Sequence, residues 1–436
     1  MIIFIGIITV FLFSMLLGVP IVYSIILASG IPILLDSYIS IGQMSNIILQ
    51  QTRSFTLWAI PLYIYCGKLL VVSGVTDDII FISKVLVGKV RGNLAFVNII
   101  TSIFFGGISG SSVADVTSLG TVIIPAMNKT GYKPEFSATL TAASATIGSI
   151  IPPSILLIVY GAIAQTSIAA LFLGGIIPGI LIGLVQMIYS YFYVIKNKIG
   201  FDTSKMEIYS VSMKIQAIIK SIFPISIFLI IIGGILKGIF TPTEAAGVAV
   251  VYIFFVSYFF KNKRNLRLFF DATIDAAKDT AVIFFVIICA SFLSWVLTYY
   301  QVFLPIVNII KTSNLNGISF LLILTLLYVI LGTFMEPCSA MLIFVPLLSP
   351  VVDLLNLNPT AVGIITVMTI RVGAITPPYG LCSLVAARIA NTNILKMTKL
   401  ILTFSIFYVL VVVILIFFPD IILFLPRLLL PNLIYR

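Results

Sequence analysis

The sequence predicts an all-α integral membrane protein with many helical spans, and three observations support this fold class. Of the 436 residues, 61% are hydrophobic and only 9% are charged, so the chain has more apolar surface than one water-soluble core can bury. The apolar residues form long runs, whereas outer-membrane barrels alternate apolar and polar residues. Two Pro-Pro dipeptides, Pro152-Pro153 and Pro377-Pro378, interrupt two of these runs and predict broken helices.

Apolar segments follow one another along the chain, and we expect about ten to fourteen crossings or half-crossings from their lengths. Some are plain spans. Others are interrupted by glycines, prolines or small polar residues, at which a helix ends or bends. The segments are 2–35, 55–73, 94–127, 136–195, 222–260, 281–310, 317–352, 361–390 and 400–425.

Two longer polar stretches separate these segments, Lys196 to Lys220 and Lys261 to Asp279. The second mixes basic residues with aromatic and apolar ones, which suits an amphipathic helix lying in the headgroup region. Its basic cluster and the basic loop from Lys84 to Arg91 are predicted to lie on the cytoplasmic side. The net charge of +11 is therefore interpreted as an orientation signal and not as a nucleic-acid site.

The chain contains no histidine and four scattered cysteines. The lack of histidine excludes imidazole metal ligands and histidine-based acid–base catalysis. The cysteines show no Cys-x-x-Cys spacing, so they suggest neither a zinc site nor a disulfide framework. An enzyme acting inside the membrane is therefore the least favoured class.

Each half of the chain carries the same arrangement, which predicts an internal duplication. One segment turns on glycines and small polar residues, around Gly107 or Gly332, and the following helix breaks at Gly148 or Gly373. The offset is the same for both features, because 332 − 107 = 225 and 373 − 148 = 225. The turning segments are too broken for one plain span, so we expect re-entrant helical hairpins. Matching interruptions in two halves mark the binding site of a membrane transporter.

The interrupted segments offer oxygen atoms that can replace the water shell of a sodium ion. Ser109, Ser111 and Ser112 supply hydroxyls at the first hairpin tip, and the break from Gly148 to Pro153 frees backbone carbonyls. The alternative is that these small residues only allow close helix packing, with each hydroxyl bonding to its own helix. Recurrence of the pattern in the second half favours the ion site.

Charged residues at membrane depth cost about 2.5–3.5 kcal/mol each on insertion scales, so each one needs a reason. Asp115 in the first hairpin and Glu336 at the second hairpin tip are interpreted as functional. Arg371 either meets a substrate carboxylate or pairs with Glu336, and the sequence does not distinguish these roles. Glu244 is different, because it follows Thr241 at the spacing of a capping box.

Six motifs in this order resemble the large permease subunit of tripartite ATP-independent periplasmic (TRAP) transporters, the DctM-like family. The similarity runs from about Ile5 to Asp420, and the joint order and spacing of the motifs are more specific than any single one. The motifs are Phe105 to Asp115, Ile124 to Met127 with Gly131-Tyr132, Gly148 to Ser154, Gly238 to Ala246, Gly332 to Glu336 and Thr376 to Gly380.

The resemblance implies an elevator-type secondary transporter with two inverted repeats, driven by two or more sodium ions (Na+) per cycle and not by ATP. Its cargo would be an organic acid, such as a C4-dicarboxylate or sialic acid, imported across the bacterial cytoplasmic (inner) membrane. Two partners are implied: a small four-helix membrane subunit, as a separate chain, and a soluble solute-binding protein. We expect scaffold helices in 1–90, 171–310 and 393–436, and mobile repeats in 91–170 and 311–392.

The resemblance also assigns sites, several of them through backbone carbonyls. One sodium site comprises Ser109, Ser111, Gly148, Ile151 and Pro153, and the other comprises Gly332, Gly373, Thr376 and Tyr379. The candidates for substrate binding or coupling are Ser112, Asp115, Glu336, Arg371 and Pro378. Arg371 and Tyr379 depart from the family, in which a small or neutral residue and a valine are common, so the substrate stays open.

Two alternatives to a TRAP permease remain at this point. One is a stand-alone sodium–dicarboxylate or citrate symporter of related architecture, which would transport without a binding protein. The other is a membrane scaffold or assembly subunit without transport activity, which would show no stabilisation by sodium.

Overall fold

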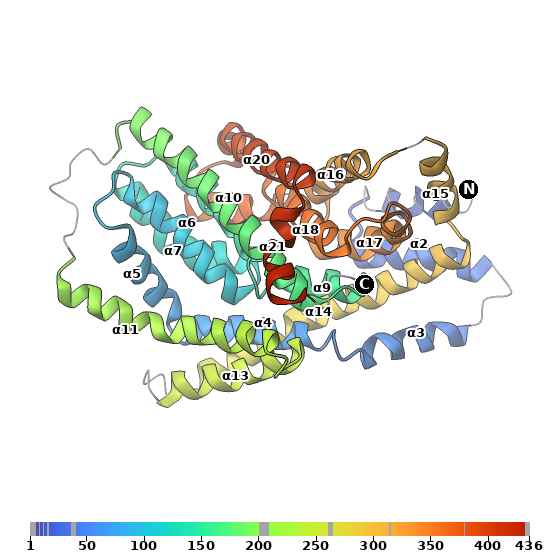
Figure 1. Cartoon of the computed structure of the whole chain (residues 1–436), viewed down its shortest axis with the longest axis horizontal. Coiled ribbons are helices and arrows are strands. Elements are labelled where there is room, and N and C mark those ends of the chain that lie inside the picture. Colours follow the sequence, from blue (N-terminus) through green and yellow to red (C-terminus); the bar gives the residue numbers. More distant parts are fainter. Residues whose placement is uncertain are drawn as a thin grey trace.

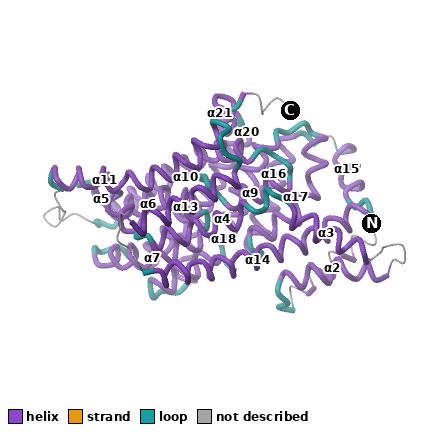
Figure 2. Tube along the Cα trace, turned by 90° about the horizontal axis from the view of Figure 1, so that it is seen from below, coloured by secondary structure: helices purple, strands orange, loops and turns teal. Residues whose placement is uncertain are grey.

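The computed structural model describes residues 6–431, except 8, 12, 15–16, 36–40, 200–208, 260–264, 314 and 379. Every regular element in this part is a helix (Figures 1 and 2), and seven of the described helices are long and apolar enough to cross a membrane. The predicted all-α membrane fold is therefore confirmed. The elements are α2 (Ile21–Leu35), α3 (Ile41–Arg53), α4 (Ala59–Val72), α5 (Val75–Val87), α6 (Asn93–Ser109), α7 (Ser112–Lys129), α8 (Pro134–Ala145), η1 (Thr146–Ser149), α9 (Ile155–Ile163), α10 (Ile168–Lys196), α11 (Val211–Phe228), η3 (Leu229–Gly233), α12 (Gly234–Leu236), α13 (Pro242–Phe259), α14 (Leu266–Tyr299), α15 (Phe303–Thr312), α16 (Gly317–Phe334), α17 (Pro337–Leu354), α18 (Pro359–Ile375), α19 (Leu381–Ile389), α20 (Ile394–Phe417) and α21 (Asp420–Leu429).

Two helical hairpins, α6–α7 and α16–α17, occupy corresponding places in the two halves of the chain. The first turns at Gly110, whose φ of +63° is a left-handed conformation that glycine adopts without a steric penalty. The second turns at Met335 and Glu336, and the Glu336 carboxylate accepts a hydrogen bond of 3.0 Å from the Ser339 amide, which caps α17. The predicted hairpins are present.

The helix after each hairpin is broken where the sequence predicts. In the first half, α8 passes into the 3₁₀ turn η1, and the chain restarts as α9 behind the N-cap Ser154, which accepts from the Leu157 amide at 3.3 Å. In the second half, α18 ends at Ile375 and α19 begins after Gly380. Both Pro-Pro peptide bonds are cis.

The two halves exchange helices around these breaks. Helix α9, which follows the first break, packs against α17 of the second hairpin, and α19, which follows the second break, packs against α7 and α8. The Tyr160 hydroxyl on α9 donates a hydrogen bond of 3.2 Å to the Pro359 carbonyl at the start of α18. Figure 1 shows α9 and α18 together at the centre of the molecule. The two repeats therefore form one interlocked body.

Several other helices, among them α4, α11, α13 and α14, pack along one side of this body, at the lower edge of Figure 1, whereas α10 and α20 lie above it in that view. Helix α4 contacts α13 and α14, and α5 contacts α11. Two ion pairs join members of this group: Lys68 to Asp279 at 2.8 Å and Lys220 to Asp78 at 3.3 Å. Lys68, Asp279 and Lys220 are partly exposed, so each pair contributes at most about 1 kcal/mol.

The structure differs from the sequence expectations at three places. The stretch expected as a separate amphipathic helix up to Asp279 is the first part of α14, a continuous helix of 34 residues, while 260–264 lie outside the described residues. The apolar run 400–425 contains two helices, because Phe418 precedes Pro419 and is thereby disfavoured from the α conformation. Helix α3 was not expected, since its sequence is too polar for a span.

The capping box at Glu244 is confirmed. The Thr241 amide donates to the Glu244 carboxylate at 2.8 Å, and the Glu244 amide donates to the Thr241 hydroxyl at 3.3 Å. Glu244 thus caps the N-terminus of α13.

Candidate functional site

The first break is a place where two backbones touch. A β-carbon on Gly106 of α6 would overlap the Cα of Gly148 in η1, and a β-carbon on Gly148 would overlap Gly106 in return. Only a pair of glycines allows this approach. The crossing glycine is thus Gly106, one residue before Gly107, which the constant offset aligns with Gly332.

The tip of the first hairpin lies on the broken helix just beyond this crossing. A β-carbon on Gly110 would stand 3.3 Å from the Pro153 carbonyl oxygen, so Ser109 and Ser111, which flank Gly110, are brought to the break. The Ser149 carbonyl is occupied, because it accepts from the Ser154 hydroxyl at 2.5 Å. Within the part of the chain that the structure describes, no donor occupies the Pro153 carbonyl. It is an oxygen that a cation can use.

Helix α7 carries two buried polar side chains near its start, and one of them, Asp115, adjoins the crossing. Asp115 is fully buried, and its carboxylate Oδ2 would overlap a β-carbon on Gly148. Ser112 is 1% exposed, and its hydroxyl has no hydrogen-bond partner among the described residues. The region of the first break therefore offers a carbonyl at Pro153, a carboxylate at Asp115 and, on the same helix as Asp115, the Ser112 hydroxyl. In this buried setting their electrostatic interactions with an ion are stronger than in water.

The second break repeats the crossing. A β-carbon on Gly373 of α18 would overlap the Cα of Gly332 on α16. The Ile375 carbonyl accepts a hydrogen bond from the Ser383 hydroxyl of α19 at 2.6 Å. This bond corresponds to the one that the Ser149 carbonyl accepts from Ser154 at the first break. The Thr376 carbonyl oxygen points toward Gly380, on which a β-carbon would lie 3.1 Å from it, and no hydrogen bond from a described donor occupies it.

The Thr376 hydroxyl does not face this carbonyl. It donates to the Val372 carbonyl at 2.7 Å and lies 3.2 Å from the Ser405 hydroxyl of α20. Any ion contact of Thr376 in this arrangement thus comes through its backbone. Ile151 is similar, since its side chain packs against Gly179 of α10 and leaves only backbone atoms for a ligand.

The remaining predicted residues are distributed as follows. Arg371 is buried on α18, two residues before Gly373. Glu336 caps α17 and forms no ion pair with Arg371 in the described structure. Pro378 is exposed at the second break. Tyr379 lies outside the described residues, and only the backbone of Ser109 is described.

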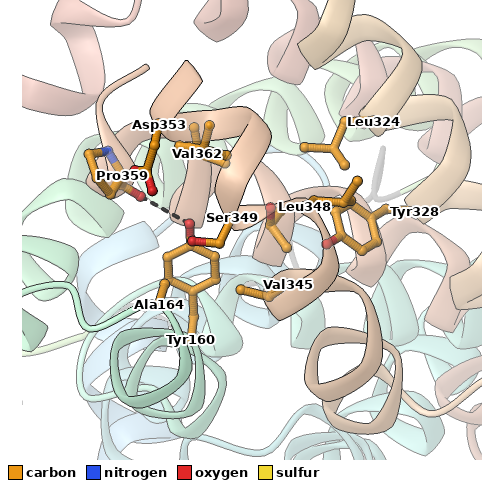
Figure 3. Close-up of a pocket in the computed structure, with 12 residues that line it drawn as sticks. Tyr160, Ala164, Leu324, Tyr328, Val345, Leu348, Ser349, Asp353, Pro359 and Val362 are labelled. Carbon is orange, nitrogen blue, oxygen red and sulfur yellow. Dashed lines mark hydrogen bonds between the residues drawn. The ribbon is translucent and has the colours of Figure 1, made fainter. Parts of the chain in front are cut away.

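A separate cavity with a mixed polar and apolar lining lies beside the C-terminal half of α17, away from the hairpin tip (Figure 3). It is lined by residues of α9, α16, α17 and α18 and has a volume of about 40 Å³. Tyr160 and Tyr328 point into it, and Asp353 stands beside Pro359 (Figure 3). Its residues come from the ends of the helices opposite to the breaks, so it is not part of the paired sites.

Comparison with known proteins decides the family. The sequence profile described as "Tripartite ATP-independent periplasmic transporter, DctM component" matches residues 8–421. The chain belongs to this DctM family.

Two relatives and one solved structure illustrate this membership. The sialic acid TRAP transporter large permease protein SiaM of Vibrio cholerae is 34% identical, and the match covers 94% of this chain and 95% of SiaM. The C4-dicarboxylate TRAP transporter large permease protein DctM of the same organism is 33% identical over 97% of both chains. The YdaH transporter of Alcanivorax borkumensis has a TM-score of 0.65 at 14% identity, covering 88% of this chain and 89% of that one, and shows the fold alone.

Membership in the DctM family has direct consequences. The chain is a TRAP transporter large permease subunit, a multi-pass protein of the inner membrane and not an enzyme. Large permeases of this family work with a small membrane subunit and a solute-binding protein.

Some residues that the structure places around the two breaks were not identified from the sequence. Tyr408 of α20 is 2% exposed, lies beside Thr146 of η1 and is within Coulombic range of Arg371. The hydroxyls of Ser383 and Ser154 each donate a hydrogen bond to a backbone carbonyl at one of the breaks. Tyr408 stands in an apolar run, where a phenol needs a hydrogen-bond partner when buried; this was the available signal.

Proposed function

We propose that this permease imports an organic acid together with sodium ions, which bind at the two places where a hairpin tip meets a broken helix. The observation that carries the proposal is the repeated glycine crossing, Gly106 on Gly148 and Gly332 on Gly373, each followed by a carbonyl without a described hydrogen-bond donor. Backbone carbonyls and hydroxyls are the ligands that hard cations such as sodium prefer.

The ligands at the first site would come from Ser109, Ser111, Gly148, Ile151 and Pro153. Those at the second would come from Gly332, Gly373, Thr376 and Tyr379. Each set joins a hairpin to a break, so a bound ion fixes the position of the hairpin tip. Two ordered tips complete the space between the breaks, where a substrate can bind. This order of events links the sodium gradient to uptake.

A carboxylate is the cargo that this setting favours. Helix N-termini carry partial positive charge and face the breaks where α9 and α19 begin. The two relatives are named for sialic acid and for C4-dicarboxylates, which are both carboxylates. The cargo would reach this chain from a soluble solute-binding protein, and a separate four-helix membrane subunit would complete the complex.

Transport would proceed as an elevator. Because α9 and α19 are exchanged between the repeats, residues 91–170 and 311–392 would move as one rigid body. The remaining helices, including α4, α11, α13 and α14, would form the scaffold along which this body slides.

The experiment that tests the proposal measures sodium-dependent uptake by the reconstituted complex. Ser111→Leu adds bulk at the first hairpin tip. Thr376→Leu removes the hydroxyl that bonds to Val372 and faces Ser405, and the larger side chain displaces the backbone that carries the second free carbonyl. We expect each variant to lower uptake by roughly tenfold or more, the equivalent of at least about 1.4 kcal/mol. Thr121→Leu, at an exposed position of α7, is the matched control. Wild-type sodium dependence in both site variants would contradict the proposal.

A further inference from the structure

Arg371 is a buried cation beside the second break, and among the described residues no ion pair balances its charge. It is 7% exposed. Within the described part of the chain, its Nε has no hydrogen-bond partner, and no carboxylate lies within ion-pair distance of the guanidinium. A cation at membrane depth costs about 2.5–3.5 kcal/mol on insertion scales. An anion that arrives during the transport cycle would offset this cost.

The groups around Arg371 come from three other helices. The thiols of Cys338 on α17 and Cys382 on α19, and the phenol of Tyr408 on α20, lie within Coulombic range of the guanidinium. All three are neutral groups that donate hydrogen bonds. The two acids of this region are engaged elsewhere: Glu336 caps α17, and Asp115 lies against Gly148. Neutral hydrogen-bonding groups therefore surround Arg371, and among the described residues neither acid forms an ion pair with it.

The internal repeat shows that this charge is an addition to one half. Arg371 corresponds to Thr146, because 371 − 146 = 225 and 373 − 148 = 225. Thr146 uses its hydroxyl locally, donating to the Ala143 carbonyl at 2.6 Å. Tyr408 interacts with both Thr146 and Arg371, so its phenol is near both related positions. The second break thus carries a buried positive charge at a position where the first break has a neutral threonine.

We propose that Arg371 binds the carboxylate of the transported acid and that the Tyr408 hydroxyl donates a further hydrogen bond to it. This inference rests on the proposed function and names the residues that select an anion. A guanidinium presents two parallel N–H donors that match the two oxygens of a carboxylate. The anion lies between the two sodium sites, so ion binding and acid binding strengthen each other.

The test uses the permease purified with its small membrane subunit and follows thermal unfolding while succinate or sialic acid is titrated in sodium chloride or in choline chloride. Arg371→Gln is expected to raise the half-effective acid concentration by about ten- to a hundredfold, as for loss of a charge-assisted hydrogen-bond pair, and to keep the sodium-induced shift. Arg371→Lys retains the positive charge but loses the two parallel N–H donors of the guanidinium, and Tyr408→Phe removes one hydrogen-bond donor. The half-effective acid concentration of both variants should therefore lie between those of wild type and Arg371→Gln. Arg388→Gln, at an exposed position of α19, should behave as wild type.

Three results would overturn the proposal. The first is wild-type acid binding by Arg371→Gln. The second is a folding defect in Arg371→Gln that Asp115→Asn repairs, because Arg371 would then be a structural counter-charge. The third is a wild-type permease that responds to sodium and to neither acid. A wild-type permease without any sodium response would instead contradict the proposed function, so the two failures are distinguishable.

Discussion

At the scale of single residues, the absence of a side chain at Gly148 and Gly373 shapes the site more than any hydroxyl does. Each lets one backbone touch another, and Gly148 also makes room for the Asp115 carboxylate. The hydroxyls around the breaks mostly serve the backbone: those of Ser154 and Ser383 satisfy carbonyls. The carbonyls of Pro153 and Thr376 accept no hydrogen bond from a described donor, so they are the backbone oxygens that a ligand can bind.

A β-carbon at either crossing should disable the permease. We expect Gly148→Ala and Gly373→Ala to destabilise the protein by about 1–3 kcal/mol, the usual cost of overpacking, and to abolish uptake because the hairpin tips are displaced. Thermal unfolding and uptake by reconstituted complex would measure both effects. Gly247→Ala on α13, where a β-carbon meets only Leu62 at 3.9 Å, is the control. Normal uptake by either crossing variant would contradict the assigned role of the breaks.

At the scale of elements, the exchanged helices α9 and α19 hold the repeats together. Tyr160 is central to this contact, because its hydroxyl reaches the Pro359 carbonyl and its ring lies against Gly363, on which a β-carbon would overlap it. The contact also lines the cavity of Figure 3. Motion of the repeats as one body depends on this interlock.

Weakening the interlock should lower stability in graded steps. Tyr160→Phe loses one hydrogen bond, and we expect a loss of about 0.5–1.5 kcal/mol. Gly363→Val forces the ring off α18 and should cost more, about 1–3 kcal/mol or above. Denaturant unfolding in detergent would measure both, with Tyr191→Phe on the exposed face of α10 as the control. If Tyr160→Phe and Tyr191→Phe were indistinguishable and Gly363→Val were neutral, the repeats would not be joined here.

At the scale of the whole molecule, the proposed elevator carries sodium sites and substrate together across the membrane field. One elementary charge moved through 100 mV corresponds to about 2.3 kcal/mol. Two sodium ions with a monoanion move one net positive charge inward, whereas two with a dianion move none. The charge on the cargo therefore decides whether voltage drives uptake.

Proteoliposomes with a potassium diffusion potential can measure this dependence. With two sodium ions per cycle, an inside-negative potential should raise the steady-state accumulation of a monocarboxylate by up to about fiftyfold per 100 mV, the equivalent of about 2.3 kcal/mol. Accumulation of a dicarboxylate should not change. A dicarboxylate that responds to voltage would show that a third ion is transported, and a monocarboxylate that does not would reduce the number to one.

The sequence predicted the local features that depend on neighbouring residues. Pro152-Pro153 and Pro377-Pro378 end helices wherever they occur, and Thr241 with Glu244 forms a capping box from its own spacing. The extent of α14 and the separate helix α21 were not predicted, because amphipathic segments leave the boundary between interface and span undefined by hydropathy alone. The offset of 225 aligns Gly107 with Gly332, whereas the glycine that the structure shows against Gly148 is Gly106. A sequence offset does not measure which α-carbons touch.

The sequence by itself determined that this chain is a helical membrane protein with a duplicated pattern of turns and breaks, because composition, proline and glycine act through local backbone geometry. The tertiary structure decided what these breaks face. Only packing shows that α9 and α19 exchange partners, that Glu336 caps its helix and does not pair with Arg371, and that Tyr408 lies near both breaks. Those contacts join residues far apart in the chain, and burial and distance in three dimensions, not spacing, fix them.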